Sequence, residues 1–161
     1  MPDYEHLRIV VDTNVALRGL TSIPSIPSRI LEACSRRKVI LLLSRVVLAE
    51  YRAVLDDPVL GLRFSMDRKA VALSLRHLCY LADVYGDKLA RFRFPRDPRD
   101  ACFIELAITG NATHLITNDQ DILSLPTAHT DAGKRFRQRL PGIQVLHPGD
   151  FVRAFPDLFP R

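Results

Sequence analysis

Short apolar runs alternate with amphipathic stretches along this chain, and the alternation predicts strands separated by helices. The clearest runs are residues 7–11 (LRIVV) and 39–43 (VILLL). Residues 114–117 and 143–146 are expected to form further strands, and 89–94 a short additional one. The uninterrupted run at 39–43 is typical of a parallel strand covered on both faces. The pattern predicts an α/β fold with a central, mainly parallel sheet of four to five strands.

Helices are expected between these strands, over residues 28–37, 44–56, 67–85 and 98–109, and from Pro148 onward. Ser44 suits the start of the second helix, because a serine hydroxyl accepts a hydrogen bond from a free N–H of the first turn. Residues 126–140 fit either a short basic helix or a loop, and both remain open.

Size and composition favour a single domain over residues 1–161 that lies in the cytoplasm. The longest apolar run, 39–43, has five residues, far below the ~20 that cross a bilayer. The polar N-terminus does not resemble a secretory signal. Cys34, Cys79 and Cys102 are odd in number and widely spaced, so they are expected to be buried, reduced thiols.

The net charge of +5 permits a polyanionic partner without requiring one. Basic side chains concentrate in residues 91–99 and 134–139. The alternation at 91–94 (RFRF) predicts a strand with phenylalanines inward and arginines outward. The second segment is more typical of a solvated helix face than of a binding patch.

Two acids directly follow predicted strands. Asp12 comes after the first strand, and Asp119 comes two residues beyond Thr117. Ligands of open parallel sheets bind at the carboxyl ends of the strands, so both acids are expected there.

Two further acids are expected on apolar helix faces. Glu50 shares its predicted face with Val47 and Val54, where an unpaired carboxylate is costly. Asp100 precedes Phe103 and Ile104 by three and four residues, so it opens the buried face of its helix.

Carboxylates gathered at one place repel each other, and a divalent cation among them relieves this repulsion. Ligation by carboxylates alone suits Mg²⁺ or Mn²⁺, which could activate water against a phosphodiester. The histidines lack the paired spacing of a zinc site. Asp12, Glu50, Asp100 and Asp119 are therefore the candidate metal-binding and catalytic residues.

Other polar residues are candidates for supporting roles. These are Asn14, Ser44, Asp97, Thr117 and Asp121, with Arg96 and Arg99 as candidate RNA contacts. Simpler explanations exist: Asp97 fits a helix cap, Asp12 fits a turn cap, and Asp119 and Asp121 fit the start of a short helix.

Four segments in this order resemble the motifs of PIN domains. They are residues 9–15 (IVVDTNV), 44–50 (SRVVLAE), 97–100 (DPRD) with Leu106 and Ala107, and 113–123 (THLITNDQDIL). The resemblance spans roughly residues 7–152 and is greatest to bacterial toxins of toxin–antitoxin pairs, the VapC-like ribonucleases.

This resemblance implies a three-layer α/β/α fold and Mg²⁺- or Mn²⁺-dependent cleavage of single-stranded RNA. Asp12, Glu50, Asp100 and Asp119 match the acidic positions of the family. The resemblance also implies a homodimer and a small antitoxin that blocks the site.

Two positions depart from the family pattern. Many relatives carry an acid where Arg99 stands and glycine where Asn118 stands. Arg99 could weaken metal binding or add a phosphate contact, whereas asparagine tolerates a left-handed turn. A catalytically weak RNA- or protein-binding module of PIN-like fold therefore stays an alternative.

Other enzyme classes fit poorly. Haloacid-dehalogenase-type phosphatases need a second aspartate where Asn14 stands, and the chain has neither a G-x-x-x-x-G-K nor a G-x-S-x-G motif.

Overall fold

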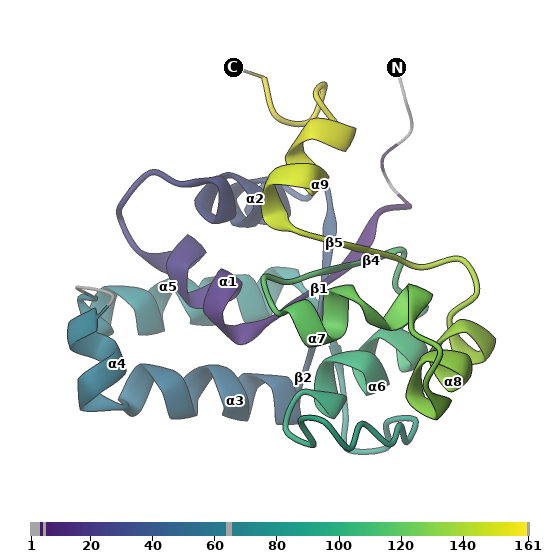
Figure 1. Ribbon diagram of the computed structural model, residues 1–161. Helices are drawn as coiled ribbons and strands as arrows, with labels where there is room; N and C mark the ends of the chain where they lie inside the picture. Colours follow the sequence, from purple (N-terminus) through teal and green to yellow (C-terminus); the bar gives the residue numbers. More distant parts are fainter. Residues whose placement is uncertain (1–3, 5, 64–65, 161) are drawn as a thin grey trace.

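A five-stranded parallel sheet forms the centre of the molecule, seen in a computed structural model that describes residues 4, 6–63 and 66–160 (Figure 1). Its strands are β1 (Arg8–Val11), β2 (Ile40–Ser44), β3 (Asp83–Tyr85), β4 (His114–Ile116) and β5 (Gln144–Leu146). Their order is β3-β2-β1-β4-β5, and every neighbouring pair is parallel. The predicted α/β class is confirmed.

Helices cover both faces of this sheet. They are α1 (Thr13–Leu20), α2 (Ile26–Ser35), α3 (Arg45–Asp56), α4 (Pro58–Arg63), α5 (Arg68–Leu81), α6 (Ala101–Thr109), α7 (Gln120–Leu123), α8 (Asp131–Arg139) and α9 (Pro148–Ala154). Helices α1, α2 and α5 pack together on one side of the strands, and α6 packs across β1, β2 and β4 on the other (Figure 1). The result is the expected three-layer arrangement.

The strand order reverses beside β1, and this reversal positions the site. From β1 the chain builds outward through β2 to β3, then returns to β4 and continues to β5. The segments that leave β1 and β4 therefore pass to opposite faces of the sheet. Such a switch point leaves a crevice at the carboxyl ends of the two strands.

The core explains why the strand sequences are continuously apolar. Val10, Leu42 and Leu115 on the inner strands are fully buried, as is Ile104 of α6. Burying such a side chain contributes about 1.5–3 kcal/mol relative to leaving it exposed.

One predicted strand and one helix boundary are wrong. Helix α5 ends at Leu81, and residues 83–85 pair with β2 instead of continuing the predicted helix. Residues 89–94 form no strand, because α6 side chains satisfy their backbone: the N–H of Phe92 donates to Glu105 and that of Ala90 to Thr109. The predicted alternation survives without pairing, since both phenylalanines are buried and both arginines exposed.

Residues 126–140, for which a helix and a loop were both possible, contain most of a 3-10 turn, Leu125–Thr127, and then α8. Cys34 and Cys102 are buried as expected, but Cys79 is only half-buried; all three are free. Among the described residues, no helix is both long and apolar enough to span a bilayer.

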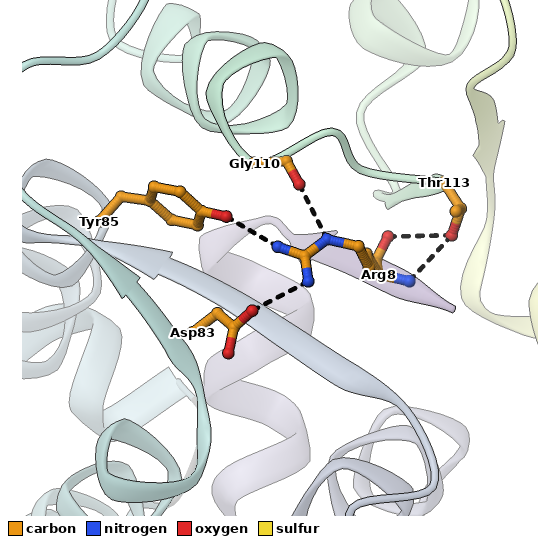
Figure 2. Close-up of polar contacts among 5 residues, drawn as sticks. All are labelled: Arg8, Asp83, Tyr85, Gly110 and Thr113. Carbon is orange, nitrogen blue, oxygen red and sulfur yellow. Dashed lines mark hydrogen bonds and ion pairs between the residues drawn. The ribbon is translucent and has the colours of Figure 1, made fainter. Parts of the chain in front are cut away.

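Arg8, at the start of β1, joins three elements through its side chain (Figure 2). Its guanidinium donates to the Gly110 carbonyl at the end of α6 (2.9 Å), to Asp83 (2.9 Å) and to the Tyr85 hydroxyl (2.7 Å). Its backbone N–H also donates to the hydroxyl of Thr113, just before β4. We call this group the Arg8 clasp; it ties β1 to β3 and to the connection between α6 and β4.

Candidate active site

A cleft of about 520 Å³ opens at the carboxyl edge of the sheet. Its walls come from α1, α3, the end of α4, the turn before α6 and the segment after β4. The acidic lining residues are Glu50, Asp97, Asp100 and Asp119, and the basic ones are Arg18, Arg63 and Arg99. The cleft lining thus combines these four carboxylates with these three guanidinium groups.

Asp12 lies at the base of this region, directly after β1, with 7% of its surface exposed. One carboxylate oxygen accepts from the N–H of Val15 (3.0 Å) and caps α1, and the other accepts from the Thr117 hydroxyl. Burial raises the pKa of Asp12, these hydrogen bonds lower it, and the charge of Asp119 raises it further.

Thr117 connects the acids that follow β1 and β4. While its hydroxyl donates to Asp12, the same oxygen accepts from the N–H of Asp119 (2.9 Å). Asp119 caps α7 by accepting from the N–H of Asp121 (2.8 Å) and also lines the cleft. Capping, the simpler explanation for Asp12 and Asp119, is therefore real, and at Asp119 it coexists with exposure to the cleft.

Asp100 lies at the start of α6 without a capping hydrogen bond from its side chain. Its pKa is raised to about 7, first by burial, then by a hydrogen bond shared with Asp119 and by the charges of Asp97, Asp119 and Asp12. These interactions mean that acids from three distant stretches of chain are brought close together.

Asp97 caps a turn rather than the helix predicted over 98–109. Its carboxylate accepts from the N–H of Arg99 (3.1 Å), and α6 begins only at Ala101. The guanidinium of Arg99 lies 3.8 Å from the same carboxylate.

Glu50 lines the cleft but is half-buried, so its expected place within a buried apolar stripe is wrong. The buried stripe of α3 is Val47, Tyr51 and Leu55, whereas Val46 is 45% exposed. Val54, an apolar residue of this helix, lines the cleft and is not among the buried core residues. The sequence pattern alone does not distinguish apolar residues of the cleft from those of the core.

Tyr51 is a site-supporting residue that sequence reasoning missed. Its buried hydroxyl donates to the carbonyl of Val11, the residue before Asp12. Since Glu50 precedes Tyr51, this hydrogen bond fixes the helix of one acid against the strand of another. Tyr51 is four residues from Val47 and from Leu55, so the sequence places it on a buried helix face. A buried tyrosine needs a hydrogen-bond partner for its hydroxyl, and this requirement could have identified it.

The remaining predicted residues lie in different places. Asn14 is exposed and lines the cleft, as does Arg18 four residues later on the same face of α1. Ser44 is fully buried and caps α3. Asp121 lies outside the cleft lining, in an ion pair with Arg96 (2.9 Å). Arg18 and Arg63 also line the cleft, and no local sequence pattern pointed to either of them.

The donors in this cleft are carboxylate oxygens, which fits a hard divalent cation such as Mg²⁺ or Mn²⁺. Asp12, Glu50, Asp100 and Asp119 are the residues that could hold one. Within residues 4, 6–63 and 66–160, however, no three acidic, histidine or cysteine side chains form a ready-made metal cluster. The arrangement is open, and neither Glu50 nor Asp100 forms an ion pair with a described lysine or arginine.

A three-layer parallel fold with an acid-lined cleft at its switch point defines a nuclease-like class of protein. The family model described as "PIN domain" matches residues 8–121, and the chain belongs to this family. PIN domains are in general nucleases that bind nucleic acid and typically use divalent metal ions. The chain is also similar to the uncharacterized protein MJ1680 of Methanocaldococcus jannaschii, with 26% identity over 149 residues, covering 92% of each chain.

Proposed function

We propose that this chain is a single PIN domain that cleaves single-stranded RNA internally, with Mg²⁺ or Mn²⁺ as cofactor. Asp12, Glu50, Asp100 and Asp119 are its proposed catalytic and metal-binding residues. The observation that carries the proposal is that Thr117 joins Asp12 to Asp119 beside a cleft that Glu50, Asp100 and Asp119 line together.

The side chains of the cleft have different proposed roles. A bound cation would lower the pKa of a water molecule and offset charge on the phosphate. Thr117 keeps Asp12 oriented through its hydrogen bond. Arg18, Arg63 and Arg99 line the same cleft and supply positive charge for the phosphate backbone of RNA.

The likeness to VapC-like ribonucleases extends this proposal to a cellular role. The protein then acts in the cytoplasm as the toxin of a toxin–antitoxin pair, as a homodimer, and is restrained by a small antitoxin protein. Three free cysteines agree with a reducing compartment.

The test is cleavage of end-labelled single-stranded RNA by the purified protein. We expect cleavage with Mn²⁺, none in EDTA, and a loss of at least about 100-fold in Asp119→Asn, as for removal of one strong electrostatic element. Asp56→Asn, an exposed acid at the end of α3, is the matched control and should retain activity.

A second candidate function is a binding module without turnover. The open arrangement of the acids and the position of Arg99 inside the cleft favour it. Wild-type protein that binds the RNA but leaves it intact in Mn²⁺ would select this candidate and reject the nuclease.

A further inference from the structure

A second pocket, of about 420 Å³, lies beside the acidic cleft between residues 93–96 and the segment from α7 to α8. Its apolar lining residues Phe94, Leu125 and Ala132 are buried. Exposed arginines also line it: Arg93, Arg96 and Arg135. We call this the arginine pocket.

The arginine pocket and the cleft share a wall. Arg96 lines the pocket, and the next residue, Asp97, lines the cleft. Likewise Asp119 lines the cleft, and Asp121 lines the pocket. Adjacent stretches of chain therefore line the two cavities at two places, at residues 96–97 and 119–121.

Specific contacts hold the pocket in shape. Arg96 and Asp121, which both line the pocket, form an ion pair (2.9 Å). Arg137 of α8 donates to the carbonyls of Pro126 (3.2 Å) and Ala128 (2.8 Å). A Cβ on Gly133 would lie 2.3 Å from the Ala128 carbonyl oxygen, so the close approach of α8 to this turn requires glycine.

The far wall of the pocket lies outside the family match. That match ends at residue 121, whereas Ser124, Leu125, Thr130 and Arg135 come later. Residues 93–96 and Asp121, which form the other wall, lie within the match.

We propose that the arginine pocket binds one nucleotide of the RNA strand next to the scissile bond. The apolar floor suits a nucleobase, and the guanidinium groups of Arg93 and Arg135 suit the attached phosphate. Asp121 and Asp131 can accept hydrogen bonds from base amino groups. This inference rests on the proposed ribonuclease function and adds a substrate subsite to it. A pocket of this volume lies within the range of small-ligand sites.

The first experiment measures nucleotide binding apart from cleavage. AMP, GMP, CMP and UMP are titrated into the full-length protein in EDTA, and amide NMR shifts of Ser124 and Ala132 are followed. We expect saturable shifts with at least one nucleotide, weakened about tenfold in Arg135→Glu and less in Arg135→Gln. Lys134→Glu is the matched control, because Lys134 is exposed on the same helix but does not line the pocket.

The second experiment measures cleavage of single-stranded RNA in Mn²⁺ by the same variants. Arg135→Glu and Arg93→Glu should raise KM about tenfold with kcat within about twofold. The slope of log affinity against log salt should fall by about 0.7 per lost phosphate contact. Thermal melting confirms that each variant is folded.

The outcomes separate the two proposals. If Arg135→Glu and Arg93→Glu bind and cleave like Lys134→Glu, the subsite is rejected while Mn²⁺-dependent cleavage can stand. If nucleotides bind in the pocket but no variant or wild type cleaves RNA, the ribonuclease is rejected and the nucleotide pocket stands.

Discussion

Asp12 and Asp100 are both acids with raised pKa values, yet their surroundings differ. Asp12 is the more buried, but hydrogen bonds from the Thr117 hydroxyl and from the backbone of Val15 and Asn118 partly compensate its charge. Asp100 has no such compensation and faces three other carboxylates, which brings its pKa to about 7. Without a cation, Asp100 is the acid whose ionisation costs the fold most.

Replacing Asp100 should therefore stabilise the metal-free protein at alkaline pH. Its folded pKa exceeds its unfolded value of 3.8, so its ionisation costs stability as the pH rises from about 4 through 7. In EDTA at pH 8, Asp100→Asn should melt a few degrees higher than wild type, where about 1 kcal/mol corresponds to about 2–4 °C. At pH 4 the two should melt together. An equal melting temperature at pH 8 would contradict the prediction.

His114 should make the fold sensitive to acid. It is buried in β4 against Phe151 and Phe155, and burial lowers its pKa to about 4. The unfolded chain takes up the proton near pH 6.5 and the folded chain does not, so stability falls as the pH drops from 6.5 to 4. In denaturant titrations, the free energy of unfolding should fall between pH 6.5 and pH 4 in wild type. The fall should be about 1–3 kcal/mol smaller in His114→Leu. Parallel pH profiles would refute this.

The sequence identified single site residues when their signal was local. Asp12 follows its strand directly and Asp119 follows within three residues, so topology alone assigned them to one edge of the sheet. Glu50 was predicted as a site residue because it was expected on the buried apolar face of its helix. The buried face of α3 lies elsewhere, but Glu50 does line the cleft. Arg18 and Arg63 depend on how α1 and α4 pack, which no local pattern reveals.

At the scale of elements, α3 is held against β1 by one hydrogen bond near the site. Tyr51→Phe removes the donor and leaves the Val11 carbonyl buried without it. We expect the free energy of unfolding to fall by about 0.5–1.5 kcal/mol in denaturant titrations. RNA cleavage should fall as well, because Glu50 and Asp12 lose their fixed relation. Full activity in a destabilised variant would show that the contact serves only the fold.

The Arg8 clasp should matter for stability and not for cleavage. Lysine at this position keeps the charge but cannot contact Asp83, Tyr85 and Gly110 at once. Arg8→Lys should lower the unfolding free energy by about 1–3 kcal/mol, with kcat on RNA unchanged below the melting transition. Arg36→Lys, whose only described ion pair is an exposed one with Glu32, is the control and should change little.

Helix boundaries were predictable where the sequence contains a capping residue. Ser44 starts α3 as expected because its hydroxyl accepts from the first turn. The end of α5 was missed because residues 83–85 continue a helical pattern and become a strand only by pairing with β2. Residues 89–94 carry a strand pattern but bond to side chains of α6. Both errors come from long-range contacts.

At the scale of the whole molecule, a chain of net charge +5 places an acid-lined cleft within a basic protein. Divalent cations should therefore bind at that cleft and stabilise the fold. Mn²⁺ at 100 times its dissociation constant should add about 2.7 kcal/mol of stability. We expect a higher melting temperature with Mn²⁺ in wild type and a much smaller rise in Asp119→Asn. An equal rise in both would place the cation elsewhere.

The Arg8 clasp also affects where the molecule opens locally. It secures the sheet away from the edge where the acids repel one another, so local opening near the cleft need not spread through the fold. Amide hydrogen exchange should be fast around residues 97–100 and slow at Ile9 and Leu115, whose strands the clasp helps to hold together. Substitutions that reshape the cleft can then accumulate without unravelling the rest of the chain.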